Sequence, residues 1–240
     1  MNSSKKNSCV YINLGKVKYQ KAWELQKILA QKRLKQNIPN VLLLLEHPPT
    51  ITIGKIGKKE NLLADEELLK QKDIDLFEVD RGGDITFHGP GQLVGYPILN
   101  LSETKPDVIW YLRQLEEVMI KTLKDFHVES ERRPKYTGVW TNEEKIAAIG
   151  VKVSRWITSH GFALNVHTDL SFFNLIVPCG IRNKNVTSMV KILKKEISLN
   201  EVIPKLVNQF GKIFDYKMVP FNHSSWPELS EVLEPAFELV

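Results

Sequence analysis

The sequence predicts an α/β (or α+β) fold in which helices cover a mixed β-sheet. The chain of 240 residues is 42% hydrophobic and 25% charged, a composition typical of a globular protein that can bury its own core. Apolar stretches of strand length outnumber helical stretches and are interleaved with them. No internal repeat and no Gly/Ser-rich linker divides the chain, so we expect residues 1–240 to form a single domain.

In the first half of the chain, apolar runs and their breakers mark the predicted elements. They indicate strands over residues 9–14, 41–46, 51–54, 76–80, 84–89 and 93–101, and helices over 18–36 and 65–72. In the first helix, helical spacing predicts an inward face of Tyr19, Ala22, Trp23, Ile28 and Leu29. Gly82 and Gly83 indicate a hairpin-like turn between two strands. Pro97 directs its strand towards a sheet edge or a bulge, because proline cannot donate a ladder hydrogen bond.

The second half begins with the clearest helix, over residues 108–126, which Asp107 is expected to cap. Strands follow near 137–141, 145–153 and 157–166, and the last two are joined by a turn near Arg155. Ser198 and Glu201 have the spacing of a capping box, which predicts a further helix to about residue 210.

Two cysteines, Cys9 and Cys179, are too few for a disulfide framework. The longest aliphatic run, residues 41–45, is far too short to span a membrane. No apolar segment follows the N-terminal lysines, so we expect no secretory signal and a cytoplasmic protein.

The positive charge is concentrated near the N-terminus. The whole chain has a formal net charge of +5, whereas residues 1–60 contain 12 basic and 3 acidic residues. A second basic group comprises Arg182, Lys184, Lys191, Lys194 and Lys195. This asymmetry indicates either an acidic partner or solvated lysines that maintain solubility.

The stretch RGGDITFHGPGQLVGYP, residues 81–97, contains five glycines and two prolines. Such a backbone turns tightly and can approach a ligand closely. The glycine spacing fits neither a dinucleotide fingerprint nor a P-loop. Arg81 and His88 bracket the first part of the stretch, and each alone has either a structural or a binding role.

Two further segments contain groups capable of chemistry. Lys145 opens the apolar strand KIAAIG, where it could act as a base of lowered pKa or reach out to water. Cys179 lies on a Pro-Cys-Gly turn in IVPCGI, where it is a nucleophile or a small buried hydrophobe. Cys9 fits only a buried hydrophobe. There is no CxxC, and His160 and His167 lack partners at ligand spacing, so we predict no metal site.

Together, RGGDITFHGPGQ, KIAAIG with HGFALN, and VPCGI with Val186-Thr-Ser188 resemble the signature segments of the lipoyl(octanoyl) transferases. These enzymes are octanoyl–acyl carrier protein:protein N-octanoyltransferases. The resemblance runs from about residue 41 to 189, with the segments in the family's order and spacing. It implies the α/β fold of the biotin/lipoate-protein ligases, with a mixed sheet around a ligand tunnel.

The resemblance also implies roles for individual residues. Cys179 matches the acyl-thioester nucleophile, and Lys145 matches the lysine that lowers the pKa of this cysteine and relays protons. Phe87 stands where many members have tyrosine. The residues matching acyl-substrate contacts are Arg81, Gly82, Gly83, Asp84, Ile85, Thr86, Phe87, His88, Ala148, Ile149, Gly150, Gly161, Phe162 and Ala163.

The implied reaction transfers an octanoyl group from acyl carrier protein to a lysine of a lipoyl domain. The implied acceptors are the lipoyl domains of 2-oxoacid dehydrogenase E2 subunits and the glycine cleavage H protein, and neither ATP nor a metal is required. One alternative is a lipoate- or biotin-protein ligase of the same fold, which uses ATP and needs no cysteine nucleophile. Another is a basic nucleic-acid-binding domain, but no helix-turn-helix or RNA-binding signature is present.

Overall fold

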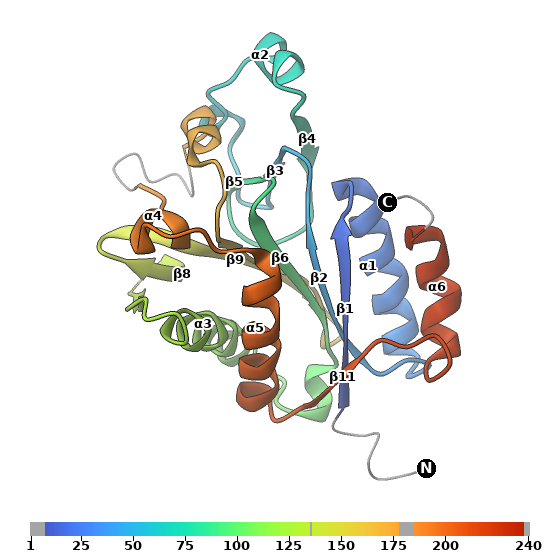
Figure 1. Ribbon diagram of the computed structural model, residues 1–240. Coiled ribbons are helices and arrows are strands. Elements are labelled where there is room, and N and C mark those ends of the chain that lie inside the picture. Colours follow the sequence, from blue (N-terminus) through green and yellow to red (C-terminus); the bar gives the residue numbers. More distant parts are fainter. Residues whose placement is uncertain (1–7, 135, 178–184, 238–240) are drawn as a thin grey trace.

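The computed structural model describes residues 8–134, 136–177 and 185–237. Its body is an eight-stranded sheet that carries helices on both faces (Figure 1). In spatial order the strands are β11 (Lys217–Pro220), β1 (Ser8–Lys16), β2 (Asn40–Glu46), β6 (Gln92–Ile98), β10 (Ile157–Asn165), β9 (Glu144–Ser154), β8 (Tyr136–Thr141) and β7 (Glu131–Arg133). β1 is parallel to both of its neighbours, and the other pairs are antiparallel. The predicted mixed sheet is therefore confirmed.

The two faces of this sheet have separate hydrophobic cores. The helices α1 (Tyr19–Leu34) and α6 (Pro227–Phe237) cover one face, and α3 (Val108–Lys124) and α5 (Leu199–Phe214) cover the other (Figure 1). The alternation of side chains along β2 explains this division: Leu42 and Leu44 pack towards α3 and α5, and Leu43 packs towards α1. Residues 41–45 of this strand are all apolar because both of its faces are buried.

The predicted helix caps are confirmed. The Asp107 carboxylate accepts a hydrogen bond from the Trp110 N–H (2.9 Å) at the start of α3. The Asp65 carboxylate accepts a hydrogen bond from the Leu68 N–H (2.8 Å) at the start of the short helix α2 (Glu66–Gln71). Ser198 and Glu201 form the expected capping box of α5. A further short helix, α4 (Met189–Leu193), precedes α5.

The predicted inward face of α1 is partly wrong. Tyr19, Ala22 and Leu29 are buried as expected, but Ile28 is 46% exposed. Leu25 is buried instead, because it lies on the stripe formed with Ala22 and Leu29 whereas Ile28 falls outside that stripe.

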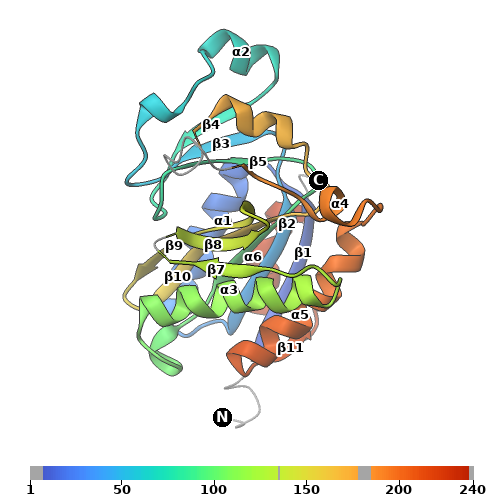
Figure 2. The same ribbon diagram turned by 90° about the vertical axis from the view of Figure 1, so that its left-hand side faces the viewer.

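A second sheet of three strands lies beside the large one (Figure 2). Its order is β4 (Asp75–Glu78), β3 (Thr50–Ile53), β5 (Ile85–His88). The predicted hairpin across Gly82 and Gly83 is therefore wrong, since β4 and β5 do not pair with each other. The connecting segment crosses to the large sheet instead, where the Gly82 N–H donates to the Val151 carbonyl of β9 (2.8 Å).

Of the two positions predicted from Pro97, a sheet edge or a bulge, the edge is wrong, because β6 lies between β2 and β10. The ladder with β10 runs over residues 92–95 and resumes only at the bridge between Asn100 and Ile157. Pro97 lies in this interruption, which accommodates its missing N–H.

A tight turn joins β9 and β10, as expected near Arg155. Both central residues, Arg155 and Trp156, have positive φ (50° and 63°), as in the type I′ turns that fit the twist of antiparallel strands. None of the helices in the described part of the chain has the length and apolar character needed to cross a bilayer.

Candidate active site

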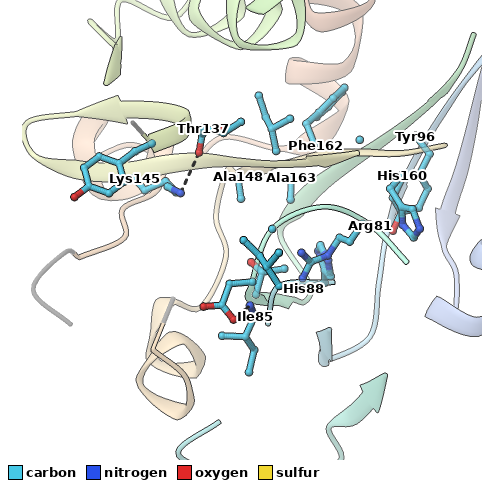
Figure 3. Close-up of a pocket in the computed structure, with 18 of the residues that line it drawn as sticks. Arg81, Ile85, His88, Tyr96, Thr137, Lys145, Ala148, His160, Phe162 and Ala163 are labelled. Carbon is cyan, nitrogen blue, oxygen red and sulfur yellow. Dashed lines mark hydrogen bonds between the residues drawn. The ribbon is translucent and has the colours of Figure 1, made fainter. Parts of the chain in front are cut away.

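A cavity of about 290 Å³ lies between the two sheets, bordered by β5, β6, β8, β9 and β10 (Figure 3). It brings together segments that are far apart in the sequence. The predicted site residues that line it are Arg81, Gly83, Asp84, Ile85, Thr86, His88, Lys145, Ala148, Ile149, Gly150, Gly161, Phe162 and Ala163. Small residues predominate where β9 and β10 face the cavity, since Ala148 pairs with Ala163 and Gly150 pairs with Gly161.

Two predicted contact residues, Gly82 and Phe87, do not line this cavity. The side chain of Phe87 is buried on the opposite face of β5 from His88, as strand alternation requires. Its ring stacks on Phe172 with the centroids 4.8 Å apart, within the core beneath the small sheet.

Arg81 fixes the start of the glycine-rich segment against β3. Its Nη2 atom donates to the Thr52 carbonyl (2.8 Å) and hydroxyl (2.9 Å), and its Nη1 atom donates to the Gly82 carbonyl (3.0 Å). At Gly150 a Cβ atom would lie 2.8 Å from the Gly82 carbonyl oxygen, so the segment approaches β9 closely there. The guanidinium group of Arg81, held by these hydrogen bonds, therefore positions the backbone that forms one wall of the cavity.

Lys145 lies at one end of the cavity and is largely buried, with 8% of its surface exposed (Figure 3). Its Nζ atom donates to the Thr137 carbonyl (3.2 Å) and lies 4.9 Å from the centroid of the Trp140 ring. Its own N–H donates to the Asn185 carbonyl, and its carbonyl accepts from the Thr187 N–H, both at 3.0 Å. The start of β9 is thereby joined to the Val186-Thr-Ser188 part of the third signature segment.

Cys179, the predicted nucleophile, lies outside the described residues. Cys9 is completely buried in the core, as expected for a small hydrophobic residue. Burial raises the pKa of the Cys9 thiol, and the nearby Arg33 offsets only part of this effect. Cys9 therefore has none of the features of a reactive thiolate.

The other end of the cavity is lined by polar aromatic residues that sequence reasoning did not assign to the site. Tyr19 and Tyr96 line this part, and Figure 3 shows Tyr96 beside His160, far from Lys145. The Tyr96 hydroxyl lies 2.8 Å from His47 Nε2, while His47 Nδ1 donates to the Val17 carbonyl (2.6 Å). Tyr96 occurs in an apolar stretch and Tyr19 on the predicted inward face of the first helix, and both patterns indicate only core positions.

The buried histidines around this end are neutral near pH 7. Desolvation lowers the pKa of His47 to about 4, although its hydrogen bond to Val17 opposes the shift. Desolvation also lowers the pKa of His88 well below its usual value. The Nδ1 atom of His88 lies 2.8 Å from Gln92 Oε1. Desolvation also lowers the pKa of His160, although its hydrogen bond to Asp80 (2.8 Å) opposes the shift. This end therefore provides hydrogen-bonding groups without positive charge on the rings.

The described residues contain no group of three or more His, Cys, Asp or Glu side chains arranged to hold a metal ion. The site consists instead of a cavity with a lysine at one end and neutral polar rings at the other.

Residues 18–211 match the profile of the lipoyl protein ligase A/B catalytic domain. The chain belongs to this family. The octanoyltransferase of Solibacter usitatus (strain Ellin6076) is 53% identical over 213 residues, covering 89% of this chain and 96% of that protein. The octanoyltransferase of Caldicellulosiruptor bescii is 49% identical over 203 residues, covering 84% and 89%. These relatives confirm the resemblance to octanoyl transferases, and this member of the lipoyl protein ligase A/B family is an acyltransferase that acts in lipoylation.

Solved structures of lipoate- and biotin-protein ligases share the fold. Lipoate-protein ligase A bound with ATP superposes with a TM-score of 0.70 at 14% identity, covering 97% of this chain and 94% of that one. The bi-partite lipoate protein ligase of Thermoplasma acidophilum gives 0.71 at 15% identity, covering 97% and 92%. The biotin protein ligase of Aquifex aeolicus in complex with biotin and ATP gives 0.51 at 14% identity, covering 87% and 70%. The predicted biotin/lipoate-protein ligase fold is confirmed.

Proposed function

We propose that this acyltransferase takes its octanoyl group from octanoyl-acyl carrier protein and transfers it to a lysine of a lipoyl domain through a thioester on Cys179. One observation supports this most directly. Lys145 lies at the end of a cavity lined by the first two signature segments, and its backbone bonds to Asn185 and Thr187, at the Val186-Thr-Ser188 part of the third. A nucleophile in the third segment and a base in the second are thus joined by a short stretch of chain.

In the first step, the Cys179 thiolate attacks the carbonyl carbon of the octanoyl thioester. The bond from this carbon to the carrier sulfur breaks, and the carrier leaves as a thiol with the proton that Lys145 took from Cys179. One thioester replaces another, so the step is nearly balanced in free energy and needs no ATP. Backbone N–H groups of the glycine-rich segment or near Gly180 are the candidate donors to the transient oxyanion.

In the second step, the ε-amine of the acceptor lysine attacks the octanoyl-enzyme. The attacking amine is neutral, so its nitrogen loses one proton as the amide forms; Lys145 takes this proton, and the Cys179 sulfur leaves as the thiolate. An amide replaces a thioester, which makes the transfer irreversible. The proposed acceptors are lipoyl domains of 2-oxoacid dehydrogenase E2 subunits and the glycine cleavage H protein.

The cavity suits an unbranched acyl chain. The small side chains of Ala148 and Ala163 leave room for it along β9 and β10. We assign the contacts to the acyl substrate to the cavity-lining residues of the three segments 81–88, 148–150 and 161–163.

Intact mass spectrometry tests the thioester. After incubation with octanoyl-acyl carrier protein and no ATP, we expect the mass to rise by one octanoyl group, in the wild type and in Cys9→Ala. Cys179→Ala should show no increase. Persistent acylation of Cys179→Ala would contradict the proposal, and so would labelling that requires free octanoate with ATP, which would indicate a ligase.

A further inference from the structure

Helix α3 contains a carboxylate that the proposed chemistry does not use. The Glu116 side chain is completely buried and accepts three hydrogen bonds. Arg113 Nη1 (2.7 Å) and Arg132 Nε (3.1 Å) bind one oxygen, and the Gly138 N–H (3.1 Å) binds the other. A buried carboxylate is tolerated only with such compensation.

The bond to Gly138 satisfies a backbone group at an irregular point of the sheet. Paired residues between β8 and β9 begin at Val139, and the register shifts between Val139 and Trp140. Gly138 has a φ of +124°, and a Cβ atom there would lie 2.6 Å from the Ala147 carbonyl oxygen. Glu116 therefore binds the N–H of a residue that the geometry restricts to glycine.

The same peptide group connects Glu116 to Lys145. The Gly138 N–H and the Thr137 carbonyl belong to one planar peptide unit, in which they point in opposite directions. Glu116 accepts from the N–H, and Lys145 Nζ donates to the carbonyl (3.2 Å). The side chain of Lys145 also lies against Gly138, since a Cβ atom there would be 3.4 Å from Lys145 Cε.

We propose that Glu116 is a positioning residue for Lys145, acting through the peptide group between Thr137 and Gly138. The carboxylate fixes the orientation of this peptide, and the peptide carbonyl holds the lysine amine at the end of the cavity. The inference rests on the role proposed above for Lys145. In this role Glu116 acts on the orientation of the Lys145 amine. A misplaced proton-transfer group slows the reaction without weakening substrate binding.

The test compares Glu116→Asp with Glu117→Asp. Aspartate keeps a negative charge beside Arg113 and Arg132, but its shorter side chain withdraws the carboxylate oxygen from the Gly138 N–H. Glu117 provides a matched control, because its carboxylate also binds Arg132 (2.5 Å) but does not contact Gly138. We expect Glu116→Asp to lower kcat about tenfold with KM nearly unchanged, and Glu117→Asp to leave both unchanged.

A double-mutant cycle with Lys145→Met gives a readout that a purely structural role would not change. Glu116→Asp should lower kcat little further in the Lys145→Met background. Equal losses in both backgrounds, or equal effects of Glu116→Asp and Glu117→Asp, would overturn the inference. If Lys145→Met alone leaves kcat unchanged, the proposed role of Lys145 fails and this inference fails with it. If Lys145→Met lowers kcat and Glu116→Asp does not, only the inference about Glu116 fails.

Discussion

The ammonium group of Lys145 has a backbone carbonyl and an aromatic ring as neighbours in a largely buried position. The carbonyl accepts a hydrogen bond from Nζ, and the ring face is of the kind that attracts a cation. A lysine held in this way can stabilise a nearby thiolate as a cation and can accept a proton when neutral.

We predict that these two roles of Lys145 can be separated by substitution. Lys145→Met removes charge and base together, so alkylation of Cys179 at neutral pH should slow and its pH midpoint should rise towards about 8.5, the value of a free thiol. Lys145→Arg keeps the charge but cannot accept a proton. It should keep much of the thiolate and lose transfer to the acceptor amine.

The measurement is the alkylation rate as a function of pH, beside turnover with the complete substrates. Cys9 provides no background because it is completely buried. An unchanged alkylation profile and unchanged turnover in Lys145→Met would show that another group, such as Lys152, His88 or His160, is the base.

A second prediction at the scale of single residues concerns His47 and the stability of the protein in acid. Its folded pKa is about 4, against 6.5 for an unperturbed histidine. Below pH 6.5 the unfolded chain binds a proton at His47 that the folded protein does not bind. The contribution of neutral His47 to the free energy of unfolding is therefore fully present above pH 6.5 and is lost as the pH falls towards 4. The loss from this group is about 1.4 kcal/mol per pH unit across that range.

Urea unfolding at pH 7 and pH 5 tests this prediction. His47→Asn should be less stable overall, but the difference in unfolding free energy between the two pH values should shrink by about 2 kcal/mol. His127→Asn is the matched control, because His127 is exposed. If His47→Asn retains the full pH dependence of the wild type, the buried neutral imidazole is not its source.

Individual site residues differ in how far the sequence could predict them. Lys145 and Arg81 were predictable because each lies within a recognisable signature segment, and both line the cavity. Tyr96 and His47 were not, because their contact joins β6 to the chain after β2 across the fold. The role of Phe87 depended on which face of β5 is turned to the cavity, and this face follows from strand pairing.

At the scale of elements, local patterns predicted strands and helices well but not how the strands pair. The strands at 75–78 and 85–88 lie where their apolar runs indicated, yet β3 separates them. The glycines at 82 and 83 allow a hairpin, but the Arg81 bonds to Thr52 and the Gly82 bond to Val151 favour a crossing between the sheets. Tertiary hydrogen bonds thus decided between two conformations that the local sequence permits.

The hairpin of β9 and β10 shows the opposite case. Its turn at Arg155 and Trp156 is local, and the strands pair in continuous register from Ile157 to Leu164. Both the element and its partner could therefore be predicted. This regular hairpin also aligns the small residues of the two parts of the second signature segment, KIAAIG and HGFALN, because Ala148 lies opposite Ala163.

At the scale of the whole molecule, the basic N-terminal region, residues 1–60, includes a loop at the rim of the cavity. Ile56 in this loop lines the cavity and is 73% exposed. The loop is fixed by bonds from the Lys55 N–H to the Arg81 carbonyl (3.0 Å) and from the Lys58 N–H to the Asp84 carboxylate (3.2 Å). Lysines and an exposed apolar side chain beside the cavity are a surface that an acidic carrier protein would fit. Two members of the second basic group, Arg182 and Lys184, lie outside the described residues.

We predict that Lys55, Lys58 and Lys59 promote encounter with acyl carrier protein. Reversing all three to glutamate should raise KM for octanoyl-acyl carrier protein about tenfold at low salt, while a small octanoyl thioester should react nearly as before. The difference should shrink as added salt shortens the Debye length to about 8 Å or less. A control with the same change in charge reverses three exposed lysines that do not line the cavity, Lys124, Lys212 and Lys217. If the carrier substrate and the small thioester lose activity equally, the loop is structural and the carrier docks elsewhere on the protein.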